Sequence, residues 1–168
     1  THVSTEFPLT EGLRKEVWLT AKELFKEGHN VEIRSFIPDK YNPFKKKTEC
    51  IKEGIKIIRG TIFNMCCFKT EILHIFSHPC PDIYPVINFA KYTKCFLTIT
   101  DGELCRFWKG KLAPIISSMI NKKVNSIFLQ TDYQKKIADK YLKCKTVVIP
   151  PIIPIFSQTK KKSKTPSI

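Results

Sequence analysis

The chain has 168 residues, 42% of them hydrophobic, and its 29 lysines and arginines exceed 15 acidic residues to give a net charge of +14. The length suits one domain with a single core, and the charge favours anionic partners such as phosphates, acidic lipid surfaces or nucleic acid. The seven cysteines include no CxxC pair, which argues against a disulfide framework or a zinc ribbon and indicates a reducing, cytoplasmic interior. No apolar run approaches the roughly 18 residues that a membrane-spanning helix needs.

The first 37 residues predict a strand, a loop, a helix and a second strand. Apolar residues recur at helical spacing from Leu13 to Phe25, and Gly28 is well placed for a left-handed cap at the helix end. The second strand, residues 31–37, follows at once. In such a unit the loop before the helix lies at the sheet edge where ligands bind.

Short apolar runs predict further strands. The runs at 72–76 and 95–99 are continuously apolar, which is typical of parallel strands covered by helices on both faces. The complete set of additional strands expected is 54–60, 72–76, 95–99, 126–129 and 146–149.

Helices are predicted between these strands. Residues 85–92 form one, and 103–120 keep a helical period that is interrupted near Pro114, which suits the first turn of a helix. Thr131 and Gln134 form a capping-box pattern that begins a helix running through Tyr141.

The sequence therefore predicts an α/β fold with a parallel sheet of about seven strands sandwiched by helices. This domain spans residues 1–153, and the basic tail 154–168 has the composition of a disordered linker, or leads to a further domain. The chain begins without methionine inside an expected strand, so we expect a piece of a longer protein.

Several segments carry a family resemblance when taken in order. They are His2–Pro8, Glu11-Gly12, Leu24–Val31 with its Gly-His pair, Ile72–Ser77, Thr98–Gly102, Phe128–Asp132 and Val147–Ile152. Together these segments resemble the amino-terminal, acceptor-side half of a GT-B glycosyltransferase, in the retaining group called glycosyltransferase family 4. The resemblance implies a Rossmann-like half-domain.

The resemblance also implies an activity. The complete enzyme would move a sugar from a nucleotide-sugar donor to a glycan, polysaccharide or lipid-linked acceptor, at the cytoplasm or the cytoplasmic face of a membrane. Neither a metal nor another cofactor is expected. The donor is held mainly by a second domain, so this chain alone would be inactive. The sequence departs from the family at Glu11, at Thr100 where histidine is common, and at Pro151-Ile152 in place of Asn-Gly.

The loop before the first helix is one candidate substrate site. Gly12 stands at a helix amino terminus, whose free N–H groups favour phosphate, and Arg14 and Lys15 add positive charge. Glu11 stands where the family places a first glycine. The alternative is a strand-to-helix turn with solvated basic residues.

A second candidate is the turn Thr100, Asp101, Gly102 and Glu103, which ends a central strand. By resemblance it faces the transferred sugar, and Asp101 is the candidate catalytic residue; alternatively Asp101 or Glu103 only caps the next helix. His78 and Thr131 complete the expected substrate-binding set.

His74, Cys80 and the Lys40–Lys47 loop are weighed separately. His74 lies inside an apolar strand and is expected to be a core residue, and Cys80 near His78 lacks a second pair for metal binding. The Lys40–Lys47 string mixes cations with aromatic rings and is a candidate contact with an anionic membrane surface. Phe107 and Trp108 also lie beside basic residues, but they fit the buried side of a helix better than a membrane contact.

Three other functions stay open. One is a subunit of a split glycosyltransferase, whose donor-binding half lies on another polypeptide. Another is a basic nucleic-acid-binding module, against which the dispersed cations and the lack of a helix-turn-helix, zinc-finger or RNP-like signature argue. The third is a nicotinamide-binding enzyme, but the sequence has no GxGxxG fingerprint, which such enzymes use to hold the dinucleotide.

Overall fold

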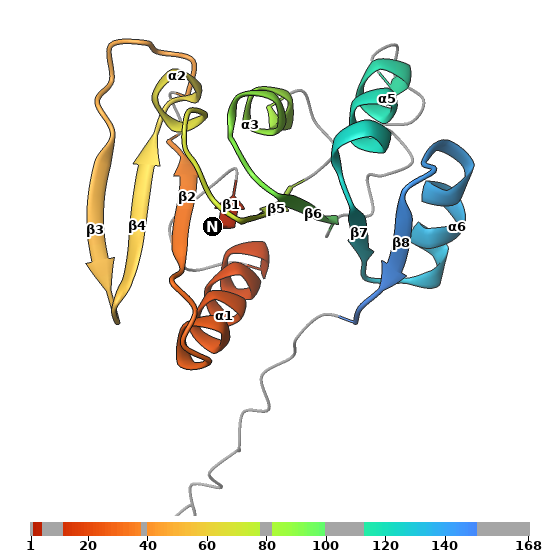
Figure 1. Ribbon diagram of the computed structural model, residues 1–168, viewed down its shortest axis with the longest axis horizontal. Coiled ribbons are helices and arrows are strands. Elements are labelled where there is room, and N and C mark those ends of the chain that lie inside the picture. Colours follow the sequence, from red (N-terminus) through yellow and green to blue (C-terminus); the bar gives the residue numbers. More distant parts are fainter. Residues whose placement is uncertain (1, 5–11, 38–39, 78–81, 100–112, 151–168) are drawn as a thin grey trace, which may run out of the picture.

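A computed structural model describes residues 2–4, 12–37, 40–77, 82–99 and 113–150. Their eight strands form one sheet in the order β3-β4-β2-β1-β5-β6-β7-β8, with helices on both faces (Figure 1). The strands are β1 (His2–Ser4), β2 (Glu32–Phe36), β3 (Thr48–Lys52), β4 (Ile55–Gly60), β5 (Ile72–Phe76), β6 (Lys94–Ile99), β7 (Ser126–Leu129) and β8 (Lys145–Val148). The helices are α1 (Gly12–Lys26), α2 (Ile62–Met65), α3 (Ile83–Phe89), α5 (Ala113–Lys123) and α6 (Asp132–Tyr141).

All neighbouring strands are parallel except β3, which runs antiparallel to β4. The predicted α/β class with a parallel sheet is therefore observed, with eight strands where about seven were expected. The additional strand is β3, whose five residues are all exposed. A strand without a buried face leaves no apolar pattern, so its sequence resembles a loop.

The β3–β4 hairpin turns on Glu53 and Gly54, with φ of 49° and 82°. Positive φ at both central residues is the geometry of a type I′ turn, whose twist matches that of the flanking strands. The positive φ at Gly54 favours glycine, and a Cβ added there would lie 2.5 Å from the outer end of the Phe25 ring, which would have to shift.

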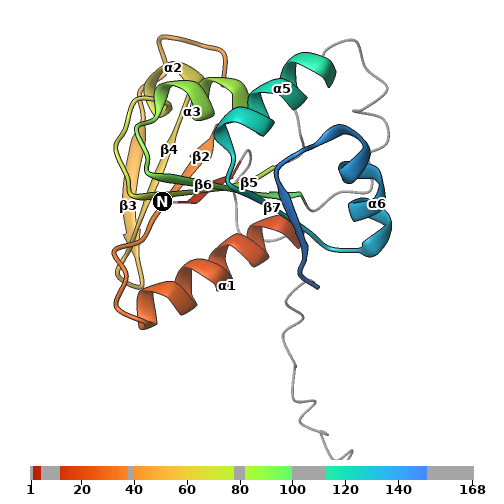
Figure 2. The same cartoon turned by 45° about the vertical axis from the view of Figure 1, so that its right-hand side comes forward.

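The helices cover the two faces unequally. Buried side chains of α2, α3, α5 and α6 pack on one face in the larger hydrophobic core, whereas α1 packs on the opposite face through Val17 and Ala21 (Figure 2). Strand side chains alternate between the two cores: Leu73 and Ile75 join the larger one, and Phe76 joins that of α1. This alternation explains the continuous apolar runs in the sequence.

The predicted cap of α1 is observed at Gly28, with φ of 85°. The Gly28 N–H donates to the Phe25 carbonyl at 3.0 Å, and the His29 N–H donates to the Leu24 carbonyl at 3.1 Å. This pair of bonds is the Schellman motif, which satisfies carbonyls that the helix end would leave free. The cap sends the chain directly into β2.

Other predicted boundaries are shifted. The helix expected at 85–92 is α3 at Ile83–Phe89, and α2 was not predicted. Pro114 lies in the first turn of α5, as predicted, whereas residues 103–112 and the tail 154–168 lie outside the described residues.

Candidate functional site at the carboxyl edge of the sheet

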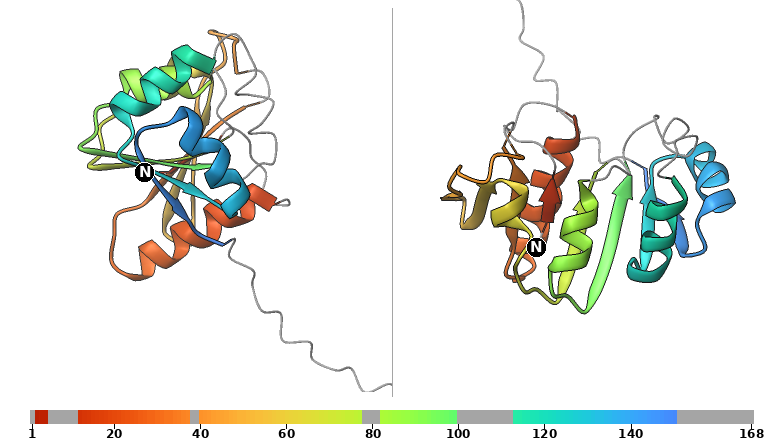
Figure 3. Two further views of the ribbon diagram at one scale, coloured as in Figure 1. Left: turned by 90° about the vertical axis from the view of Figure 1, so that its right-hand side faces the viewer. Right: turned by 90° about the horizontal axis from the view of Figure 1, so that it is seen from above.

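The carboxyl ends of the central strands meet at one edge of the sheet. β1 lies between β2 and β5, and β5 pairs with β6, all in parallel. The chain order reverses between β1 and β5, because the chain runs from β1 to β2 on one side and returns to β5 on the other. In open α/β sheets ligands bind at such a reversal, outside the carboxyl ends of the strands. Figure 3 (right) shows the arrows of β5 and β6 pointing to the same edge.

Most predicted site residues follow these strand ends. Glu11 lies in the segment after β1, His78 follows β5 by two residues, and the Thr100–Glu103 turn follows β6. The fold thus places the starts of the three segments on adjacent strands. Glu11, His78, Thr100, Asp101, Gly102 and Glu103 themselves lie outside the described residues, as does Cys80.

The amino terminus of α1 belongs to the same edge. The helix begins at Gly12, so Arg14 and Lys15 lie in its first turn, and the Lys15 side chain is exposed. The first N–H groups of a helix have no intrahelical acceptors and carry partial positive charge. This first turn has no acidic residue to compete for them.

Glu16 is a carboxylate at this edge that the sequence analysis missed. Its Oε2 accepts a hydrogen bond from Gln130 Nε2 at 3.3 Å, which joins α1 to the segment after β7. Partial burial raises the pKa of Glu16, and the hydrogen bond from Gln130 opposes that shift. The helical period of α1 marks Glu16 only as a residue beside the buried Val17; its meeting with Gln130 depends on the tertiary fold.

The turn between β7 and α6 holds Gln130 in place. The almost completely buried Gln134 uses its Oε1 to accept from the backbone N–H of Gln130 at 2.7 Å and of Thr131 at 3.1 Å. The Thr131 hydroxyl in return accepts from the Gln134 N–H at 3.2 Å. The predicted capping box is therefore confirmed, and Thr131, a predicted substrate-binding residue, has a structural role as the cap.

The Lys40–Lys47 loop is fastened to the protein at its beginning. Asp82, which precedes α3, pairs with the Lys40 ammonium and accepts a hydrogen bond from the Tyr41 hydroxyl at 2.6 Å. Lys47 pairs with Glu49 at 3.0 Å. Part of the positive charge predicted for this loop is therefore neutralised within the chain, while Phe44 remains 90% exposed.

His74 is hydrogen-bonded, as expected of a core histidine, but it is only partly buried and belongs to neither hydrophobic core. Its Nε2 lies 2.7 Å from the Thr98 hydroxyl, and its ring contacts those of Phe76 and Phe128 at 4.2 and 5.7 Å between centroids. Burial lowers its pKa to about 4, so the ring is neutral at physiological pH. A neutral, hydrogen-bonded histidine beneath α1 contributes to packing.

Neither a cysteine pair nor a metal cluster adds a second site within the residues described. Burial raises the pKa of Cys66 to about 11 and that of Cys95 to about 12, which leaves both as unreactive thiols. Across the same residues no group of three histidine, cysteine or acidic side chains is placed to hold a metal ion.

None of the helices described is long and apolar enough to cross a bilayer.

The chain matches no protein-family model and no curated protein at a significant level.

Proposed function

We propose that the chain is the acceptor-binding half of a GT-B glycosyltransferase, with a Rossmann-like half-domain fold. The observation that carries the proposal is the strand order, which reverses between β1 and β5 and places the starts of the Glu11, His78 and Asp101 segments on three adjacent strands. This is the edge where parallel α/β sheets bind ligands.

The chemistry of the edge supports a phosphorylated or hydroxyl-rich ligand. The start of α1 supplies N–H groups and partial positive charge beside Lys15. The Glu16 carboxylate and the Gln130 amide add an acceptor and a donor of hydrogen bonds nearby. Sugar hydroxyls pair with donors and acceptors of hydrogen bonds, and lipid phosphates pair with N–H groups and positive charge.

The donor-binding half would lie on the same or on another polypeptide, and transfer would need both. Asp101 is then the proposed catalytic residue, and the other predicted residues would hold the acceptor at the cytoplasmic face of a membrane. No cofactor is part of this proposal.

Amide NMR shifts of the isotope-labelled chain test the binding half of the proposal without the second domain. Farnesyl phosphate serves as a lipid-phosphate acceptor analogue, and maltotriose serves as a glycan. We expect either ligand to shift the amides of Lys15, Ser77 and Gln130, which lie at the carboxyl edge. The proposal fails if neither ligand shifts them, or if shifts appear only at the opposite edge, near Asn30 and Thr70.

The Lys15→Gln variant is the matched test of the charge at this edge. It should weaken the binding of farnesyl phosphate, whereas Lys94→Gln, which changes an exposed lysine at the amino end of β6, should not. Equal weakening by both variants would indicate that the protein's total charge attracts the phosphate, with no site at this edge.

A further inference from the structure

Three helices on one face of the sheet expose apolar side chains. Phe63 of α2 is 63% exposed, Tyr84 and Phe89 of α3 are 46% and 61% exposed, and Ile115 of α5 is 59% exposed. The view from above shows these helices beside one another over the sheet (Figure 3, right). Outward positions of a surface helix are normally polar or charged. Apolar residues gathered at such positions indicate a surface that contacts something other than water.

The same three helices have no acidic residue at all. α5 ends with the exposed Lys122 and Lys123. The other described helices differ, since α1 carries the Glu23–Lys26 pair at 2.7 Å and α6 carries the Lys135–Asp139 pair at 3.3 Å. The outer surfaces of α2, α3 and α5 are therefore apolar and cationic, whereas α6, on the same face of the sheet, and α1, on the other, have ordinary charged surfaces.

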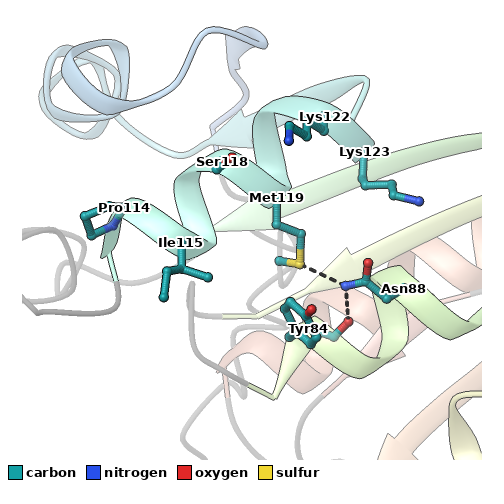
Figure 4. A pocket seen from close by; sticks show the side chains of 8 residues that line it. All are labelled: Tyr84, Asn88, Pro114, Ile115, Ser118, Met119, Lys122 and Lys123. Carbon is teal, nitrogen blue, oxygen red and sulfur yellow. Dashed lines mark hydrogen bonds between the residues drawn. The ribbon is translucent and has the colours of Figure 1, made fainter.

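A groove of about 510 Å³ runs between α3 and α5 (Figure 4). Tyr84, Ile115 and Met119 are among the side chains that line it, and the two lysines at the end of α5 also belong to its lining. The Asn88 amide within it donates to the Tyr84 carbonyl at 2.9 Å and contacts the Met119 sulfur at 3.3 Å. The groove thus combines an apolar wall with cations.

The Lys40–Lys47 loop is attached to this face. The Lys40 carbonyl accepts from the Ile62 N–H at 2.9 Å, and the Asn64 side chain of α2 donates to the Lys45 carbonyl at 2.8 Å. The loop carries Phe44, the most exposed large apolar side chain in the described part of the chain. Its aromatic and basic residues therefore extend the surface of the helices.

We propose that this surface docks on an anionic lipid bilayer; we call it the docking face and define it by Phe44, Phe63, Tyr84, Phe89, Ile115, Lys122 and Lys123. Aromatic and aliphatic side chains enter the boundary between headgroups and acyl chains, while lysines reach the phosphates. Each lysine near an anionic surface strengthens binding by about fivefold. The absence of carboxylates from the three helices removes the repulsion that would oppose this contact.

The observations favour a bilayer over nucleic acid. A nucleic-acid surface needs cations spaced along a phosphate backbone. The docking face as defined has five exposed apolar or aromatic side chains but only two lysines, both at the end of α5. The inference goes beyond the proposed function, because lipid binding does not require sugar transfer. Its test measures only lipid binding, so its failure would leave the acceptor site unaffected.

Cosedimentation of the whole chain with lipid vesicles tests the docking face. We expect binding to vesicles of phosphatidylcholine mixed with phosphatidylglycerol, weaker binding at high salt, and much weaker binding to phosphatidylcholine alone. The Lys122→Gln/Lys123→Gln variant should bind roughly thirtyfold more weakly. The control Lys22→Gln/Lys26→Gln loses the same charge from α1, on the opposite face, and should bind nearly as well as the original chain.

A second pair of variants tests the apolar contribution. Tyr84→Ser should weaken vesicle binding, while Tyr133→Ser, which removes an exposed tyrosine from α6, should not. Circular dichroism confirms that each variant is folded. The proposal is overturned if the chain does not bind anionic vesicles, if the two lysine variants are weakened equally, or if a short DNA duplex binds more tightly than the vesicles and through the same lysines.

Discussion

The Gln130 side chain donates a hydrogen bond to the Glu16 carboxylate across 3.3 Å, between residues 114 positions apart in the chain. The bond joins the first half of α1 to the turn after β7, and so links the two ends of the candidate site. Burial raises the pKa of Glu16 despite this bond. The fold therefore partly disfavours the ionised form of this carboxylate.

Replacing Glu16 with glutamine should stabilise the fold at neutral pH. The raised pKa means that the folded chain holds the Glu16 proton more tightly than the unfolded chain does, so the contribution of this group to stability falls as pH rises through the usual glutamate range. Glutamine has the same shape, carries no charge and can still accept from Gln130.

Urea unfolding of Glu16→Gln and the original chain at several pH values checks this. We expect a higher midpoint for the variant at pH 7 and convergence of the two midpoints as pH falls below about 4. A variant with a lower midpoint at neutral pH would contradict the prediction, because it would mean that the ionised carboxylate stabilises the fold.

The Thr131→Ala variant should be destabilised by about 1 kcal/mol, since the Gln134 N–H loses the hydroxyl that accepts from it. For a chain of this size the melting temperature should fall by about 2–4 °C. Thr131→Ser keeps the hydroxyl and should melt close to the original chain. Equal losses in both variants would show that the methyl group, and not the cap, stabilises this turn.

The sequence predicted the parallel sheet because its buried strands, such as Ile72–Phe76, leave continuous apolar runs. It also predicted the caps at Gly28 and Thr131, where a local rule links residue type to backbone geometry. It missed β3, which has no buried residue, and α2, which is too short for a helical period to show.

The candidate site was predictable as an edge of the sheet but not as a set of contacts. Glu16 and Gln130 meet because α1 crosses beneath several strands, and no local pattern encodes that distance. Likewise the pairing of Lys40 with Asp82, which reduces the charge of the basic loop, joins residues 42 positions apart. Contacts of this kind depend on tertiary packing.

His74 should make the stability of the chain depend on pH between about 4 and 6.5. Its pKa is lowered to about 4 by burial, so the unfolded chain binds the proton more tightly than the folded chain does. The contribution of the neutral ring is complete above pH 6.5 and is lost as pH falls towards 4, by at most roughly 3 kcal/mol.

Thermal melts of His74→Phe and of the original chain at pH 7 and pH 5 measure this contribution. The original chain should lose more stability between the two pH values than the variant does, because phenylalanine cannot be protonated. An identical loss for the original chain and His74→Phe would show that His74 does not titrate in this range.

Gly28→Ala and Gly54→Ala separate backbone strain from collision. Both glycines have φ above 80°, where a Cβ costs about 1–2 kcal/mol. A Cβ at Gly28 would have no atom within 4 Å, so Gly28→Ala should lose only that amount of unfolding free energy.

At Gly54 the Cβ would lie 2.5 Å from the Phe25 ring, so Gly54→Ala should lose more unfolding free energy than Gly28→Ala. Adding Phe25→Ala to the Gly54→Ala chain should recover part of that excess. Urea unfolding of Gly28→Ala, Gly54→Ala, the Gly54→Ala/Phe25→Ala double variant and Phe25→Ala alone measures the cost of backbone strain and the cost of collision with the ring. If the two single glycine variants are equally destabilised, the Phe25 ring, which is 41% exposed, moves aside without cost and the hairpin requires glycine for its backbone conformation only.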